Sequence, residues 1–186
     1  RLSALRPAKK EAFAARYDAF AKKLHAALAG EQLAAKYDAE KLAVLAEHGK
    51  LEGFLKEQGQ ANLVGGWLGR LAPFRDAAVV ADHNLWPYFA ARFGLKVVGF
   101  FEPKPGIPPT TAHLTELVGL MQAQKVRAVP TVPYLDRRHA AFVAEKTGAR
   151  IASVVHQSGA ASDAGDYLAM VEHNVREVER ALQTTP

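Results

Sequence analysis

The sequence predicts an α/β protein. Its main part is a three-layer domain whose four-stranded, mainly parallel sheet is flanked by helices, and a long helix and extra short helices precede it. Two observations predict this class. Four short apolar runs lie in the second half of the chain, and a helical pattern separates each from the next. Such an alternation indicates right-handed βαβ units, whose strands are parallel.

The first part of the chain is expected to be helical. At residues 1–30 we predict a long connecting helix, because Pro7 suits a first helical turn and Gly30 suits a helix end. Between them, large apolar side chains recur every three or four residues, as on one face of a helix: Phe13, Tyr17, Phe20, Leu24 and Leu28. Residues 31–75 are expected to form a helical insertion made of short helices, with no role that the sequence assigns.

The α/β lobe is expected at residues 76–186. Its strands are predicted at 77–81, 96–101, 126–132 and 150–155. Its helices are predicted at 85–93, 113–124 and 137–147, with a last helix that carries Leu168, Val171, Val175, Val178 and Leu182 on one stripe. Pro130 weakens the third strand, because proline has no N–H to donate to a ladder.

Composition excludes several classes of function. The 186 residues are 49% hydrophobic and 23% charged, which is ordinary for a globular protein. The absence of cysteine rules out disulfides, Cys-type zinc sites and thiol catalysis. The net charge of +5 is spread without a basic block, so no nucleic-acid partner is expected. No apolar run approaches the ~18 residues that a membrane span requires.

Two histidines and a glutamate lie in the loops just after predicted strands: His83 after the first, Glu102 after the second and His156 after the fourth. Ligands of an open parallel sheet bind at the carboxyl ends of its strands, and neutral imidazole is a common zinc ligand. His83 and His156 are therefore candidate metal ligands. Two ligands do not complete a zinc site, which has four, or three plus water. The others would come from Glu102, from water or from another domain.

Less specific interpretations compete with metal binding. A histidine at a strand end is often an ordinary polar residue. His173 is expected to be an exposed helix residue, and Asp163 and Asp166 precede the last helix, where N-capping would account for both. Dinucleotide and phosphate loops and a G-x-S-x-G elbow are absent, and Ser158 has no evident base and orienting acid.

Five segments in order resemble one protein family. The run from His83 to Leu95 fits the pattern H-x-x-x-x-Y-F-x-x-x-x-G-L. The segments that follow are 102–114, 134–138, 146–149 and 166–174, the last with Asp166, Tyr167, Met170 and Asn174. Over about residues 67 to 183 the chain resembles the periplasmic solute-binding proteins of bacterial zinc and manganese ABC importers.

That resemblance implies two α/β lobes joined by one long helix, with the metal between the lobes and two ligands from each. The helix at 7–28 would be the connector or its end, and the α/β part would be the C-terminal lobe. The third ligand of the family falls on His83. The fourth, commonly Asp, lies after the last strand of the lobe, where the nearest match is His156, with Asp163 as second choice.

The implied function is capture of a divalent metal, with no catalysis, and its delivery to an ABC permease in the membrane; the implied location is the periplasm. Imidazole ligands favour zinc over manganese as the transported ion. The chain departs from the family pattern in three ways. No Asp follows its last strand, residues 30–66 form an extra segment, and a His-rich loop is missing.

Other hypotheses remain open at this stage. The same scaffold could serve as a metal-free interaction or sensor module, with Trp67 and Trp86 on a partner surface, or as a metal-assisted hydrolase with Glu102 as its base. The chain begins with Arg1, so we expect a processed or truncated product that lacks the N-terminal lobe. Such a half-receptor is expected to self-associate through its exposed inter-lobe surface.

Overall fold

The computed structural model describes residues 1–102, 104, 107–134 and 136–183. The chain forms two compact units, Arg1–Gly69 and Arg70–Pro186, and each is described by itself. The boundary lies at Gly69, whereas the sequence places the start of the α/β lobe at residue 76. Among the helices of the described residues, none combines the length and the apolar character needed to cross a bilayer.

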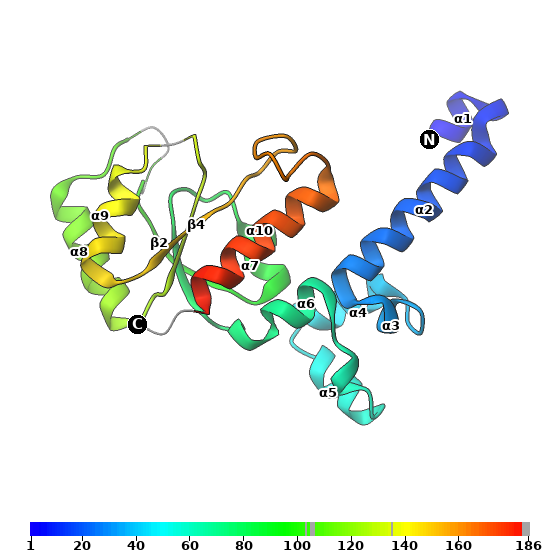
Figure 1. The fold of residues 1–186 in the computed structure, drawn as a ribbon, viewed down its shortest axis with the longest axis horizontal. Coiled ribbons are helices and arrows are strands. Elements are labelled where there is room, and N and C mark those ends of the chain that lie inside the picture. Colours follow the sequence, from blue (N-terminus) through cyan, green and yellow to red (C-terminus); the bar gives the residue numbers. More distant parts are fainter. Residues whose placement is uncertain (103, 105–106, 135, 184–186) are drawn as a thin grey trace. The chain divides into compact units, whose positions relative to one another are not determined.

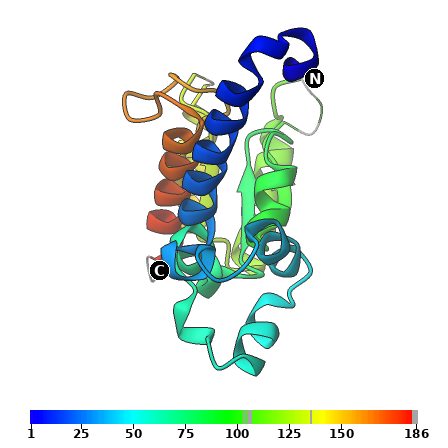
Figure 2. The ribbon, with the colours of Figure 1, turned by 90° about the vertical axis from the view of Figure 1, so that its right-hand side faces the viewer.

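Unit 1 is helical. Its longest element, α2, runs without a break over 20 residues (Figures 1 and 2). The elements in order are α1 (Leu2–Leu5), η1 (Pro7–Lys9), α2 (Lys10–Ala29), α3 (Glu31–Ala34), α4 (Ala39–Glu47), α5 (Leu51–Glu57), η2 (Ala61–Leu63) and α6 (Gly66–Leu71), whose last residues lie beyond the boundary.

Local chemistry explains where these helices begin and end. Helix α2 stops at Gly30, whose φ of +85° is a backbone conformation that favours glycine. Gly66 opens α6 beside the end of α2, where a Cβ atom would lie 2.3 Å from the carbonyl oxygen of Ala27. Helix α4 begins at Asp38, whose side chain accepts a 2.9 Å hydrogen bond from the Lys41 N–H and so caps the helix.

Unit 2 confirms the predicted α/β class. Its elements are η3 (Ala72–Phe74), β1 (Ala78–Ala81), α7 (Pro87–Phe93), β2 (Lys96–Phe100), α8 (Thr111–Ala123), β3 (Ala128–Thr131), α9 (Arg138–Thr147), β4 (Arg150–Ser153) and α10 (Tyr167–Leu182). The four strands pair in parallel in the order β2-β1-β3-β4. Each strand predicted from the sequence is one to three residues longer than the observed one.

The strand order explains the three layers. From β1 the chain moves outward to β2, then crosses back over β1 to β3 and continues to β4. Right-handed crossovers in opposite directions place their helices on opposite faces of the sheet. Helix α7 accordingly lies with α10 on one face, and α8 and α9 lie together on the other (Figure 1).

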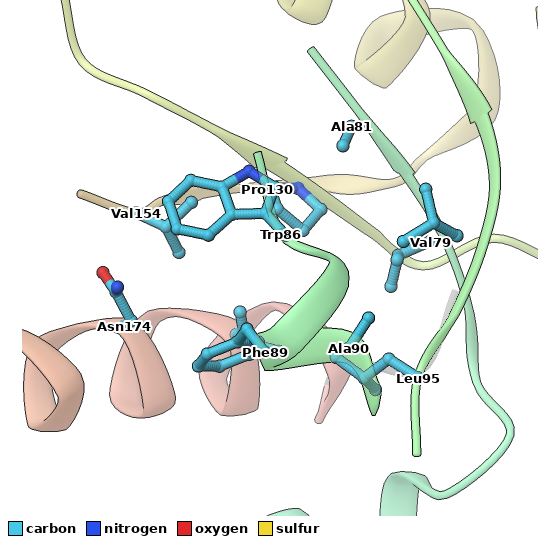
Figure 3. Close-up of a pocket in the computed structure, with 11 residues that line it drawn as sticks. Val79, Ala81, Trp86, Phe89, Ala90, Leu95, Pro130, Val154 and Asn174 are labelled. Atoms are coloured by element: carbon cyan, nitrogen blue, oxygen red, sulfur yellow. The ribbon is translucent and has the colours of Figure 1, made fainter. Parts of the chain in front are cut away.

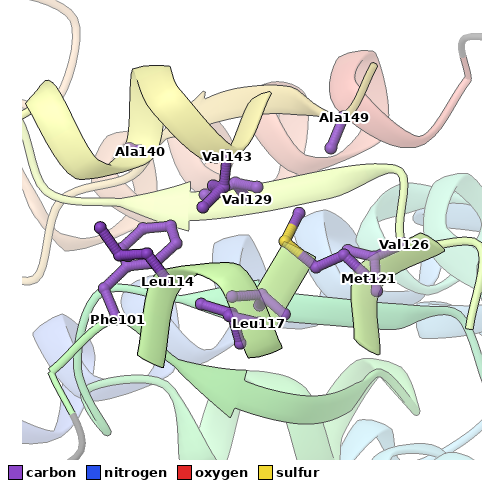
Figure 4. Close-up of a cluster of buried hydrophobic side chains, with 10 residues drawn as sticks. Phe101, Leu114, Leu117, Met121, Val126, Val129, Ala140, Val143 and Ala149 are labelled. Atoms are coloured by element: carbon purple, nitrogen blue, oxygen red, sulfur yellow. The ribbon is translucent and has the colours of Figure 1, made fainter. Parts of the chain in front are cut away.

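The main hydrophobic core fills the space between the sheet and the pair α8 and α9 (Figure 4). Val80 of β1 and Val129 of β3 are fully buried there and face the apolar side of both helices. The other buried members are Phe101, Leu114, Leu117, Met121, Val126, Ala140, Val143 and Ala149. Because this core fixes the strands, it also fixes the loops that leave their carboxyl ends.

The ladder between β1 and β3 is the shortest in the sheet. One Cα pair, Val79 with Ala128, is in register there, against four pairs on each of the other two ladders. Pro130 lies in β3 and has no N–H to donate, which shortens the ladder without removing the strand from the middle of the sheet. The sequence therefore predicts correctly both that a strand forms here and that proline weakens it.

Candidate metal centre

Polar side chains gather at the carboxyl edge of the sheet. His83 follows β1, Glu102 follows β2, Tyr134 follows β3 and His156 follows β4. Because the strand order is β2-β1-β3-β4, these residues lie along the edge in the spatial order Glu102, His83, Tyr134 and His156. The chain leaves β1 and β3 in opposite directions along the sheet, which makes their junction the point of an open α/β sheet where ligands usually bind.

His83 and Glu102 form the first pair at this edge. The Nε2 atom of His83 lies 3.4 Å from Oε2 of Glu102, and both side chains are about three-quarters buried, with relative exposures of 20% and 25%. Their backbones are held together as well. Phe101 N–H donates to the Ala81 carbonyl at 3.0 Å, and Glu102 N–H donates to the Asp82 carbonyl at 3.3 Å. The pair is thus fixed at its base and open to solvent at its tip.

Tyr134 and His156 form the second pair. The Tyr134 hydroxyl contacts Nδ1 of His156 within hydrogen-bond distance and lies 3.2 Å from Nε2, and the two rings meet edge to face at 5.5 Å. Both residues are exposed. The hydroxyl thus lies against both ring nitrogens, and His156 could bind a metal through one of them only if the hydroxyl kept its contact with the other alone.

Asp82 joins the two halves of the edge and is only 5% exposed. One of its carboxylate oxygens accepts a 2.8 Å hydrogen bond from the backbone N–H of His83, and the other accepts a 2.7 Å bond from the N–H of Val132. Its side chain therefore ties the end of β1 to the end of β3, where Pro130 has shortened the ladder. This contact also fixes the backbone that carries His83.

Asp163 is already engaged within the loop between β4 and α10. Its carboxylate contacts the Arg176 guanidinium and lies 2.8 Å from Nδ1 of His173. The hydrogen bond from Arg176, with a smaller contribution from His173, lowers the pKa of Asp163 below its ordinary value. The expectation of an N-cap applies instead to Asp166, whose side chain accepts a 2.9 Å bond from the Ala169 N–H.

The expectation that His173 is an exposed helix residue is wrong. It is 9% exposed, and its second ring nitrogen, Nε2, lies 2.8 Å from the carbonyl oxygen of Ser153. His173 therefore bridges the end of β4 and Asp163 in the following loop. It is part of the scaffold under that loop.

Asn174 supports His156 from below. This buried side chain accepts a 2.8 Å hydrogen bond from the Val155 N–H and donates a 2.7 Å bond to the Val155 carbonyl. The Asn174 side chain also borders a cavity of about 10 Å³, which Trp86 and Phe89 line as well (Figure 3). Val155 directly precedes His156, so Asn174 holds the backbone that presents this candidate ligand.

The two candidate ligands lie on the same edge but in different pairs. Because β3 lies between β1 and β4, their strand ends are two strand spacings, about 10 Å, apart. Across residues 1–102, 104, 107–134 and 136–183, no three His, Asp or Glu side chains are grouped closely enough to hold a metal ion. The edge therefore offers two separate partial sites.

Comparison with known families identifies the lobe. The family model "Zinc-uptake complex component A periplasmic" (ZnuA) matches residues 67–181. This is more than half of the chain. The chain belongs to the ZnuA family. The match includes all four strands and both pairs at the carboxyl edge, so the resemblance seen in the sequence is confirmed.

Solved structures show the same fold over nearly the whole chain. FpvC, a solute-binding protein of Pseudomonas aeruginosa solved with Mn²⁺, has 23% sequence identity and a TM-score of 0.61 over 98% of this chain and 55% of its own. Laminin binding protein Lmb of Streptococcus agalactiae has 19% sequence identity and a TM-score of 0.60, over 98% of this chain and 57% of its own. A periplasmic metal binding protein from Candidatus Liberibacter asiaticus has 16% sequence identity and a TM-score of 0.55, over 97% of this chain and 56% of its own.

The chain spans about half the length of these structures. No curated protein sequence matches it significantly.

The sequence did not reveal the residues that support the candidate ligands. Tyr134, Asp82 and Asn174 were not predicted to contact or carry the histidines. One signal was present for Asp82, because an acidic residue directly after an apolar strand is often buried and hydrogen-bonded at the strand end. For Tyr134 and Asn174 the signal lies in the three-dimensional contacts alone.

Proposed function

We propose that this ZnuA-family chain is the metal-binding lobe and linker helix of a periplasmic substrate-binding protein, which captures zinc and passes it to an ABC permease in the membrane. It acts as a binding protein, not as an enzyme. The observation that carries the proposal is the position of His83 and His156 on one carboxyl edge, inside the segment matched by a zinc-uptake family.

His83 and His156 are the proposed ligands from this lobe. Asp163 is the weaker candidate, because Arg176 and His173 already occupy its carboxylate. The ring of His156, by contrast, is exposed and its contact is with a hydroxyl, which can remain as the outer hydrogen-bond partner of a bound imidazole. Because the strand ends that carry the histidines are about 10 Å apart, the two loops need to move toward each other for both rings to bind one ion.

A second lobe is proposed to complete the site. The chain spans about half of its structural relatives, and two ligands leave zinc short of its usual four. The rim of the carboxyl edge carries apolar side chains in water: Tyr88 is 90% exposed and Tyr134 52%. Two exposed aromatic rings beside the candidate ligands would suit a protein contact at this edge. We assign it to the second lobe of the same protein, and in its absence to self-association.

Zinc is the proposed cargo and manganese the alternative. Imidazole suits zinc, whereas carboxylate and carbonyl oxygens suit harder ions such as manganese. FpvC has been solved with Mn²⁺ and with Ni²⁺. The two histidines of this lobe, both on loops of the matched segment, favour zinc.

Isothermal titration with zinc tests the proposal. The unmodified chain should bind one zinc ion in the micromolar range or more weakly, because the remaining ligands would come from a second lobe. The variants His83→Ala and His156→Ala should each weaken binding by at least about tenfold. His48→Ala removes an exposed histidine of unit 1 and is the matched control.

Equal binding by the unmodified chain and His83→Ala would remove His83 from the site. If neither chain binds zinc saturably, the metal-free interaction module becomes the better interpretation. A longer chain with a second α/β lobe should raise the affinity by orders of magnitude over that of this chain.

A further inference from the structure

We infer that Glu102 is a metal ligand beside His83, so that the end of β2 contributes to the site together with the ends of β1 and β4. The inference rests on the proposed metal-binding function and adds to it a carboxylate donor. It names the pair His83 and Glu102 as the place where the ion first binds this lobe.

The distance between the two donor atoms fits zinc. His83 Nε2 and Glu102 Oε2 are 3.4 Å apart. Zinc binds imidazole nitrogen at about 2.0–2.1 Å and carboxylate oxygen at about 2.0–2.2 Å with tetrahedral angles, which places two such donors about 3.4 Å from each other. An ion can therefore enter between them without a rearrangement of either backbone.

The backbone under the pair is held from three directions. Glu102 N–H donates to the Asp82 carbonyl, the Asp82 carboxylate accepts from the His83 N–H, and the same carboxylate accepts from Val132 N–H. A site whose ligands are fixed by buried hydrogen bonds loses little entropy when the ion binds. The relative side-chain exposures of 20% and 25% leave the donor atoms accessible to an incoming ion.

The Glu102 carboxylate would also neutralise part of the charge of a bound divalent cation. A divalent cation held by neutral imidazoles alone keeps its full charge at a partly buried site, which is unfavourable. One carboxylate within bonding distance reduces that charge by half. Glu102 is the acidic side chain that the structure places against a candidate histidine, whereas Asp163 contacts His173 and Arg176.

The test compares three substitutions in the complete chain by zinc titration and by Co²⁺ absorption spectroscopy. Glu102→Gln removes the charge and keeps the size, and it should weaken zinc binding by about ten- to a hundredfold. Glu102→His replaces one zinc ligand by another and should restore most of the affinity. Glu116→Gln makes the same charge change on the exposed face of α8 and should have no effect.

The Co²⁺ spectrum separates a ligand from a residue that only orients His83. Exchange of oxygen for nitrogen in Glu102→His should shift the visible d–d bands, whereas an orienting residue would leave them in place. Circular dichroism checks that each variant is folded.

Several outcomes would overturn the inference. These are zinc affinity of Glu102→Gln within twofold of the unmodified chain, no rescue by Glu102→His, or unchanged Co²⁺ bands. Absence of saturable zinc binding by the unmodified chain would also overturn it. If His83→Ala loses binding while Glu102→Gln keeps it, the proposed function stands and the role of Glu102 falls.

Discussion

Asn174 provides a sharp test of how the loop after β4 is held. Replacing it by alanine removes both partners of Val155, whose N–H and carbonyl lie 2.8 and 2.7 Å from the amide of Asn174. Val155 is fully buried. Each buried backbone group left without a partner costs about 1–3 kcal/mol, so Asn174→Ala can cost about 2–6 kcal/mol.

The neighbouring cavity lowers this value. Its volume of about 10 Å³ grows by the space of the deleted amide, and the freed Val155 N–H and carbonyl then give this otherwise apolar space two polar partners for a water molecule. We therefore expect a loss of about 3 kcal/mol, at the lower end of the range. Asn174→Leu fills the space with apolar atoms and keeps water out, so it should cost more than Asn174→Ala.

Native-state hydrogen exchange measures the effect at the residue concerned. The Val155 amide should exchange about 100-fold faster in Asn174→Ala, which corresponds to about 3 kcal/mol, and urea unfolding of unit 2 should show a matching loss. Asn84→Ala removes an exposed amide from the same edge and is the control. An exchange rate within tenfold of the unmodified protein, or a loss no larger than for Asn84→Ala, would refute the role assigned to Asn174.

Two further substitutions test local structure. Gly66→Ala should destabilise unit 1 by more than about 2 kcal/mol, because the new Cβ would lie 2.3 Å from the Ala27 carbonyl oxygen and the backbone φ is +54°. The control Gly53→Ala lies in helix α5 with no atom within 4 Å of its Cβ, and it should be neutral or stabilising. Equal melting temperatures of the two variants would contradict this. The Asp136 carboxyl accepts hydrogen bonds from the Arg138 guanidinium at 2.5 and 2.8 Å and from the Arg138 backbone N–H at 2.9 Å, and together they lower its pKa from 3.8 to about 2. These contacts therefore stabilise the fold above about pH 4, and the effect disappears as the pH falls toward 2. Arg138→Ala removes the guanidinium and keeps the backbone donor, so an NMR titration should find a pKa raised above 2 but still below 3.8; a value still near 2 would rule out the guanidinium as the main cause.

The architecture was predictable because it depends on patterns that sequence displays directly. Apolar runs alternating with amphipathic stretches determine a parallel sheet with helices, and the helix that ends in Leu182 shows its buried stripe at every third or fourth position. The common edge for His83 and His156 followed from the same reasoning, since all strands of a parallel sheet end on one side.

The contacts of His173 and Tyr134 could not be predicted from the sequence, and the reason is physical. His173 is polar and lies in a helix with charged neighbours, so a pattern that registers apolar residues treats it as exposed; only the Ser153 carbonyl and Asp163, brought there by the fold, make its burial favourable. Tyr134 likewise reaches His156 across 22 positions. Such pairings depend on loop conformation, which hydrophobic periodicity does not encode.

The short ladder between β1 and β3 separates two strand pairs with longer ladders, one ending in Glu102 and His83 and the other in Tyr134 and His156. The Asp82 carboxylate, which accepts from the Val132 N–H, and the Asp82 N–H, which donates to the Pro130 carbonyl, both join the two strands there. If one cation binds both histidines as proposed, it would link the two strand pairs across that ladder. The mechanical stiffness of the lobe, and not only its occupancy, would then differ between the loaded and the empty protein.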